Sequence, residues 1–228
     1  MCIGEGFKSI SIRYNYRYAK QIEVSVRHMH VLLFLLAICN SPKIYVLAAS
    51  TRDNTNKPIG DAFDKTLANP FAYGSGHVQP NSAIDPGLIY DLSIVDYLNF
   101  LCASGYDQQL ISALNFNSTF TCSGSHSITD LNYPSITLPN LGLNAITVTR
   151  TVTNVGPAST YFAKAQLRGY NIVVVPSSLS FKKIGEKRTF GVIVQATSVT
   201  KRGNYSFGEL LWTNGKHLVR SPITVRRK

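Results

Sequence analysis

Residues 146–152 read Ile-Thr-Val-Thr-Arg-Thr-Val, in which apolar and polar side chains alternate with a period of two. This alternation predicts a β-strand that buries one face. Segments of similar character follow, separated by clusters of Gly, Pro, Asn and Ser, at 161–167, 172–175, 190–194, 207–212 and 217–225. About seven short strands in about 100 residues are typical of an immunoglobulin-sized β-sandwich. We therefore expect a mainly β fold, with a seven-stranded antiparallel sandwich over residues 131–228.

The apolar positions of these segments indicate which side chains fill the sandwich. Trp212, the single tryptophan of the chain, is expected in the core rather than on a binding surface. Asn214-Gly215 lies between two predicted strands and favours a two-residue hairpin. The side chains that we expect to be interior are Val152, Phe162, Val174, Phe181, Phe190, Val192, Leu210 and Trp212.

The segment that precedes the predicted sandwich is different in character. Residues 51–90 are rich in Asn, Asp, Pro and Gly, which indicates loops. Residues 93–103 are expected to be helical, with Asp91 or Ser93 as the N-cap, and residues 108–114 form a second short helix. About 78 residues of this kind bury little apolar surface alone, so residues 51–128 are expected to be less compact than the sandwich.

The first 50 residues form an atypical N-terminal segment. Residues 31–39 are a nine-residue apolar run, too short for a membrane-spanning helix, which needs roughly 20 residues. The run has the length of the apolar part of a signal peptide, although the stretch before it is long for one. The alternative is that residues 1–49 come from a truncated or misassembled coding sequence.

The net charge of +11 is unevenly distributed along the 228 residues. Residues 1–50 carry +4, residues 51–130 carry −5 and residues 131–228 carry +12. A strongly basic module can bind acidic polymers, although a merely soluble basic surface has the same composition. The chain has no zinc-finger, RNA-binding or helix-turn-helix pattern, so nucleic acid is not an expected partner.

Candidate sites of modification or metal binding are few. The four cysteines are Cys2, Cys39, Cys102 and Cys122, and their spacing matches no metal site. Cys102 and Cys122 lie 20 positions apart and could close one loop. Asn117 and Asn204 begin Asn-x-Ser/Thr sequons, which matter if the chain enters the secretory pathway.

Seven stretches, in order, resemble motifs of the plant subtilisin-like serine proteases, or subtilases. They are Phe71-Ala-Tyr-Gly-Ser-Gly-His-Val-Gln-Pro80, Ala83-Ile-Asp-Pro-Gly-Leu-Ile-Tyr-Asp91, Asp96-Tyr-Leu-Asn-Phe-Leu-Cys102, Leu131-Asn-Tyr-Pro-Ser135, Arg150-Thr-Val-Thr-Asn-Val-Gly156, Gly185-Glu-Lys-Arg-Thr-Phe190 and Trp212-Thr-Asn-Gly-Lys-His-Leu-Val-Arg-Ser-Pro222. The resemblance implies that residues 51–128 are a small, partly helical remnant of the subtilisin α/β domain. It implies that residues 129–228 are the fibronectin type III-like domain that follows, and that Cys102 pairs with Cys122.

The Gly-Thr-Ser-Met segment that carries the family's nucleophile is absent from this sequence. The resemblance implies serine endopeptidase activity for the family, but we expect no catalytic residue in this chain. Ser75, His77, Asp85 and Asp91 could be mistaken for a triad, yet their expected roles are structural. His126 and His217 have no metal-ligand spacing, and no metal or cofactor is expected.

Two functions therefore stay open. The first is that of a truncated subtilase homologue, secreted to the extracellular space or cell wall like its family, with protein or peptide partners and no activity alone. The second is that of a non-catalytic secreted β-sandwich that binds protein partners or acidic cell-wall polysaccharide. No stable membrane span is expected in either case.

Overall fold

The computed structural model describes residues 47–61, 66–114 and 120–228. The apolar run 31–39, Cys2, Cys39 and Asn117 lie outside the described residues. The elements before the sandwich are β1 (Ala49–Ser50), α3 (Pro70–Tyr73), β2 (His77–Val78), α4 (Pro80–Ile84), β3 (Leu88–Ile89), α5 (Ile94–Ala103), α6 (Gln108–Leu114) and the 3-10 helix η1 (Ile128–Asp130). The strands that follow are β4 (Ile136–Leu141), β5 (Ile146–Asn154), β6 (Ser159–Leu167), β7 (Tyr170–Val175), β8 (Ser178–Phe181), β9 (Lys187–Ala196), β10 (Tyr205–Thr213) and β11 (Leu218–Arg227).

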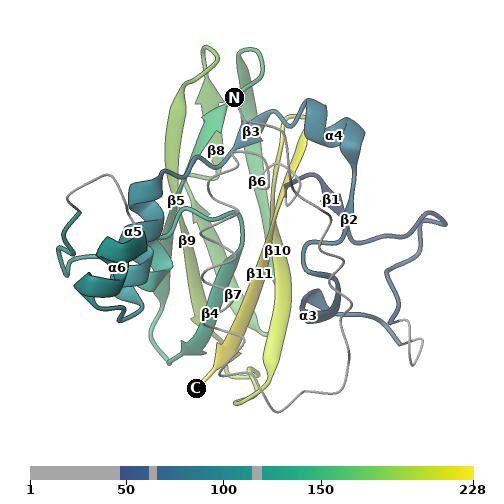
Figure 1. Ribbon diagram of the computed structural model, residues 1–228. Coiled ribbons are helices and arrows are strands. Elements are labelled where there is room, and N and C mark those ends of the chain that lie inside the picture. The colour runs from purple at the N-terminus through teal and green to yellow at the C-terminus, as the bar shows by residue number, and fades with distance from the viewer. Residues whose placement is uncertain (1–46, 62–65, 115–119) are drawn as a thin grey trace, which may run out of the picture.

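Two sheets form the sandwich at the centre of the molecule (Figure 1). One has the strand order β4-β11-β10-β6-β8 and the other has the order β3-β5-β9-β7. All neighbouring strands are antiparallel except β4 and β11, which are parallel. The fold is mainly β, as predicted, but residues 129–228 contribute eight strands rather than seven. Strands β4 and β8 were not predicted from the sequence.

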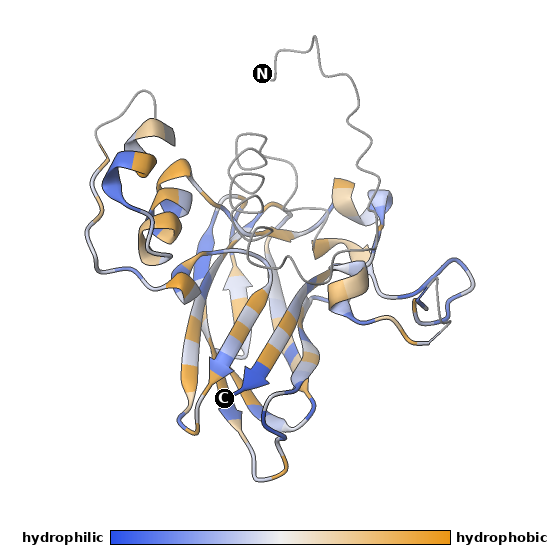
Figure 2. Cartoon of the chain, turned by 60° about the horizontal axis from the view of Figure 1, so that its bottom comes forward, coloured by the Kyte–Doolittle hydropathy of each residue, from blue (hydrophilic) through white to orange (hydrophobic). Residues whose placement is uncertain are grey.

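Hydrophobic and hydrophilic residues alternate along the strands (Figure 2), and the hydrophobic side chains pack between the two sheets. Trp212 is fully buried, and its ring centroid lies 5.0 Å from that of Phe190. Of the eight side chains expected in the interior, seven are buried and Phe162 is 57% exposed. Neighbouring Tyr161 is buried instead, because its ring packs edge-on against Phe181 at 6.0 Å between centroids.

The helices α5 and α6 lie on one side of the sandwich (Figure 1). Ser93 is the N-cap of α5, and Asp96 completes a capping box with it. Leu98, Leu101 and Ile111 form a small apolar cluster between the two helices. Ile94, the first residue of α5, is 53% exposed, so the buried face of the helix begins one turn later, at Tyr97 and Leu98.

Residues 47–61 and 66–91, which we call the N-terminal strap, lie on the opposite side of the sandwich, where the early part projects as a loop and β3 near the end joins a sheet (Figure 1). Leu88 and Ile89 pair with Asn154 and Thr153 of β5. Leu47, Leu88 and Tyr90 belong to the same apolar cluster as Trp212. The strap therefore supplies core residues to the sandwich although it precedes residue 129.

Candidate functional site

The strap is fastened to the sandwich by a cluster around His217, in the loop between β10 and β11. His217 Nε2 lies 3.0 Å from Asp85 Oδ1, and Lys216 Nζ lies 2.8 Å from Asp85 Oδ2. Hydrogen bonds from Lys216 and from His217 hold the pKa of Asp85 below its usual value. This Asp–His pair joins strap residue 85 to the sandwich.

The remaining polar atoms of this cluster are accounted for. Asn214 Oδ1 accepts hydrogen bonds from the backbone N–H groups of Lys216 and His217, which fixes the amide so that Nδ2 is the donor. That donor lies 3.2 Å from His217 Nδ1 and 2.9 Å from Ser159 Oγ. Tyr161 Oη also lies 3.3 Å from His217 Nδ1. The second ring nitrogen thus faces a phenol and an amide, and not a serine hydroxyl.

Asn214 also explains a difference from the expected hairpin. The register pairs Thr213 with Leu218, so the loop has four residues and not two. The side chain of Asn214 closes this longer loop, and Gly215 takes the positive φ of 90° that the turn requires. The longer loop carries Lys216 and His217 toward the strap.

Gly87 allows the strap to approach this cluster closely. Its φ is +76°, and a Cβ there would lie 2.4 Å from Tyr161 Oη and 2.8 Å from His217 Cγ. Any side chain would therefore collide with the cluster and strain the backbone.

A second fastening point surrounds Arg220 of β11. Its Nε lies 2.6 Å from Glu209 Oε2, and its Nη1 donates to the carbonyl of Ser75 at 2.9 Å. Arg220 is 8% exposed, and its charge is compensated by Glu209 of the neighbouring strand. The contact with Ser75 holds the Gly74-Ser75-Gly76 turn of the strap against the sheet.

Arg150 of β5 organises the segment that joins the helices to the sandwich. Its guanidinium donates to the carbonyls of Tyr133 at 3.0 Å, Thr129 at 2.7 Å, Thr149 at 2.8 Å and Ser135 at 3.4 Å. Burial lowers the pKa of Arg150 to about 10, and the four carbonyls compensate for the lost hydration. These bonds fix the course of residues 129–135.

Asn132 and Asp91 extend this arrangement. Asn132 exchanges two hydrogen bonds with the backbone of Thr151 and also donates to the carbonyl of Asp91 at 3.0 Å. Asp91 accepts from Thr153 Oγ1 at 2.6 Å, and its carboxylate lies 3.2 Å from Lys187 Nζ. Asp91 thereby links the end of the strap to β5 and β9.

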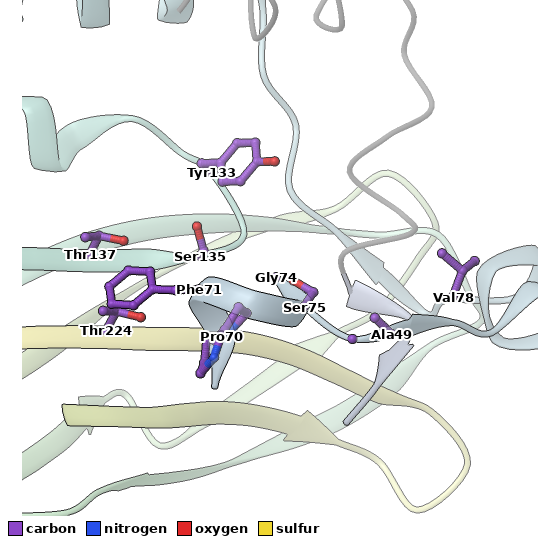
Figure 3. Close-up of a pocket in the computed structure, with 12 residues that line it drawn as sticks. Ala49, Pro70, Phe71, Gly74, Ser75, Val78, Tyr133, Ser135, Thr137 and Thr224 are labelled. Atoms are coloured by element: carbon purple, nitrogen blue, oxygen red, sulfur yellow. The ribbon is translucent and has the colours of Figure 1, made fainter. Parts of the chain in front are cut away.

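A cavity of about 440 Å³ lies between the strap and the sandwich (Figure 3). The strap contributes Pro70, Phe71, Gly74 and Val78, while Thr137 and Thr224 come from β4 and β11. Phe71 extends toward Thr137 and Thr224, and its ring packs edge-on against Tyr205 at 4.9 Å. Titratable side chains other than Tyr133 are absent from its described lining, so it supplies no acid–base pair.

The predicted site residues are found in separate places. Cys102 and Cys122 are joined in a disulfide with a Cα–Cα distance of 5.8 Å, beside the cluster formed by α5 and α6. Asn204 is exposed just before β10. Ser75, Asp85 and Asp91 take part in three different contacts, and His77 is exposed in β2, paired in the sheet with Ser50. Within the described ranges, no group of three or more His, Cys, Asp or Glu side chains is placed to hold a metal ion.

The sequence analysis assigned no individual role to Arg150, Asn132, Glu209 or Arg220, although all but Glu209 lie in stretches that resemble the family. Arg150 and Arg220 could have been noticed from the sequence, because each interrupts an apolar strand pattern with a charge. A long cation at such a position needs partners, and the partners are backbone carbonyls and one carboxylate. The identity of those partners depends on tertiary structure.

The comparisons with known proteins agree with this arrangement. A fibronectin type-III domain model matches residues 130–225. "Subtilisin-like protease Glyma18g48580" of Glycine max is 71% identical over 181 residues, which is 79% of this chain and 23% of the relative. "Subtilisin-like protease SBT5.3" of Arabidopsis thaliana is 49% identical over 180 residues, which is 78% of this chain and 23% of that relative.

The chain belongs to the plant subtilisin-like protease family. It spans about a quarter of the length of these curated relatives. Among solved structures, a FixG-related protein from Vibrio parahaemolyticus has a TM-score of 0.32 and 11% identity, over 37% of this chain and 79% of its own. This structural similarity is too low to support a conclusion about function.

Six of the seven stretches that resemble the family supply contacts that hold the strap and the segment 129–135 to the sandwich. Those stretches contain Ser75, Asp85, Asn132, Arg150, Lys187 and Arg220. The remaining stretch, 96–102, forms most of α5 and carries Cys102. In this chain, six of the seven stretches that resemble subtilase motifs therefore make structural contacts with the sandwich. No described helix is long and apolar enough to cross a membrane.

Proposed function

We propose that this chain is the supporting C-terminal part of a subtilisin-like serine endopeptidase and does not hydrolyse peptides by itself. In this proposal the sandwich and the strap form one scaffold. The peptidase activity belongs to a longer protein of the family, whose substrates are proteins or peptides. The observation that carries the proposal is that the family motifs here make contacts between the strap and the sandwich.

The chemistry of the His217 cluster supports the absence of catalysis. Serine hydrolysis needs a nucleophile within hydrogen-bond reach of a general base, with a carboxylate on the other side of the ring. Asp85 occupies the carboxylate position, but Tyr161 and Asn214 occupy the other side of His217. Among the described residues, no histidine has a serine hydroxyl as a hydrogen-bond partner.

We also propose that the protein is secreted, as plant subtilases typically are. A disulfide between Cys102 and Cys122 persists in an oxidising compartment and not in the cytosol. Asn204 is exposed and accessible to N-glycosylation, and Asn117 is the second proposed site.

Two measurements test the proposal. The purified chain is incubated with a fluorophosphonate probe and with a casein substrate, and we expect neither labelling nor cleavage. Stoichiometric labelling of any serine would refute the absence of a nucleophile.

The second measurement tests the scaffold in a complete protein. The matching segment of the Glycine max relative is replaced by the corresponding residues of this chain, and the chimera is expected to cleave peptides. An Arg220→Ala chimera should lose secreted, folded enzyme, because it loses the contact with Ser75, whereas a matched Leu143→Ala chimera should not, since Leu143 is 66% exposed. A folded but inactive parent chimera would contradict the proposal.

A further inference from the structure

Five cations gather at one end of the sandwich, which we call the basic end: Arg168, Lys201, Arg202, Arg226 and Arg227. They come from three segments that hydrogen bonds hold together. The loop before β10 contacts the β6–β7 turn, because Thr197 Oγ1 donates to the carbonyl of Gly169 at 2.9 Å. The same loop contacts β11, because the N–H of Gly203 donates to the carbonyl of Arg227 at 3.0 Å. The five charges therefore lie around one end of the fold.

The charges of the basic end are not compensated within the described chain. Arg202 and Arg227 face each other in a parallel β-bridge, although like charges in opposed positions destabilise a sheet. The described ion pairs all lie elsewhere and involve Lys187, Arg188, Lys216, His217 and Arg220. From residue 131 onward the sequence has just two carboxylate side chains, Glu186 and Glu209. Glu209 is paired with Arg220 and Glu186 with Arg188.

The described ion pairs of the acidic strap lie away from this end. Its described ion pairs join Asp85 to Lys216 and Asp91 to Lys187. Lys216 is in the loop between β10 and β11, whereas Arg226 pairs with Tyr205 at the far end of the same two strands. The described ion pairs of the strap thus compensate charges at the opposite end of the sandwich, and the strap reaches the basic end through the uncharged ring contacts of Phe71 with Tyr205 and Phe207.

Two arginines of the basic end are held in position. Arg226 Nε donates to the carbonyl of Pro139 at 2.9 Å, its Nη2 donates to Asn140 Oδ1 at 3.1 Å, and its Cζ lies 5.2 Å from the centre of the Tyr205 ring. Arg227 Nη1 donates to the carbonyl of Thr200 at 2.8 Å. Each guanidinium has five N–H donors, so donors are left over on both. Their positions are set before an anion arrives, which lowers the entropy cost of binding.

We infer that the basic end binds an anionic polysaccharide whose charges are carboxylates. An arginine guanidinium can donate two parallel hydrogen bonds to the two oxygens of one carboxylate. A linear polyanion carries many such groups and can bind several cations along its length. Tyr205, which is 37% exposed and contacts Phe71 and Arg226, adds a small apolar surface for a sugar ring. The disulfide between Cys102 and Cys122 favours a compartment outside the cytosol, where polysaccharide is a more available polyanion than nucleic acid. This binding site is independent of the proposed peptidase function.

The test uses the full chain, produced without glycans and with its disulfide formed, and polygalacturonate as the probe. The variant Arg168→Gln/Lys201→Gln/Arg202→Gln removes three exposed charges of the basic end. The control Lys164→Gln/Lys182→Gln/Lys183→Gln removes three exposed charges elsewhere, so both variants have the same net charge. Binding is measured by biolayer interferometry at about 50 mM and at about 150 mM NaCl.

We expect the basic-end variant to bind at least about tenfold more weakly at the lower salt concentration, since it removes three of the five cations of the basic end. The control should change the affinity by less than about twofold, and raising the salt should weaken the parent. Equal loss in both variants would overturn the inference, because net charge alone would then explain binding. So would absence of binding by the parent at low salt, or tighter binding to single-stranded DNA than to polygalacturonate.

Discussion

Replacing Leu88 by alanine tests whether the strap is part of the sandwich core. Leu88 is fully buried in the cluster that contains Trp212, although it lies 41 positions before the expected boundary at residue 129. If β3 completes the core, the substitution opens a cavity there. If residues 129–228 are an independent unit, the substitution should leave the stability of the sandwich unchanged.

The size of the effect follows from burial. Leucine-to-alanine substitutions in cores cost about 2–5 kcal/mol, from lost transfer free energy and from the cavity left behind. The zero exposure of Leu88 places it in this class, and we take about 3 kcal/mol. With a urea dependence of about 2 kcal/mol/M, the unfolding midpoint should fall by about 1.5 M.

Trp212 provides the assay. It is the single tryptophan of the 228 residues and has no exposed surface, so its fluorescence reports on the sandwich alone. Urea unfolding is followed by this signal and by far-ultraviolet circular dichroism. Leu143→Ala is the matched control, because Leu143 is 66% exposed and should shift the free energy by less than about 0.5 kcal/mol. An unchanged Trp212 transition in Leu88→Ala would show that the strap is not part of the core.

Three further predictions follow from the contacts described above. Gly87→Ala should destabilise the fold by at least about 2 kcal/mol, because of its positive φ and the 2.4 Å approach to Tyr161; a thermal scan that matches the parent would contradict this. Burial raises the pKa of Tyr90 to about 12, above its unfolded value of about 10, so its stabilising contribution is present below pH 10 and is lost as the pH rises toward 12. Between pH 10 and pH 12 the free energy of unfolding of Tyr90→Phe should therefore fall by roughly 3 kcal/mol less than that of the parent, as measured by urea unfolding at each pH. If the two free energies fall in parallel with pH, the assignment to Tyr90 is refuted. A double-mutant cycle with Arg220→Met and Glu209→Gln should give a coupling free energy of about 1–3 kcal/mol, and additive effects would show that the two side chains act independently.

The class of fold was predictable because strand periodicity is a local property. The strand at 146–152 and the helices at 93–103 and 108–114 all have strong local signals, and each is found close to its expected bounds. β4 and β8 were missed for local reasons as well. Pro139 interrupts the pattern of β4, and β8 has just four residues after a Pro-Ser-Ser turn.

The orientation of Phe162 could not be predicted in the same way. Tyr161 and Phe162 are adjacent aromatic residues, so a period of two allows either one to face inward. The choice is made by Phe181 and His217, which contact Tyr161 from β8 and from the β10–β11 loop. Neither partner is near in sequence.

The fastening contacts were beyond sequence reasoning for a similar reason. The approach of Asp85 to His217 joins positions 132 residues apart, and that of Ser75 to Arg220 joins positions 145 apart. Sequence alone marks such residues as polar and gives no partner. The family resemblance showed that these stretches matter, and the geometry shows that they do so as contacts.

The guanidinium of Arg150 has a mechanical consequence for residues 129–135. A connection between two parts of a chain often acts as a hinge, because few bonds cross it. Here tension on the helices would pass through Thr129, Tyr133 and Ser135 into one planar group rooted in β5. The load is shared in parallel, so the connection would behave as a strut that transmits force and orientation from one part of the protein to the other.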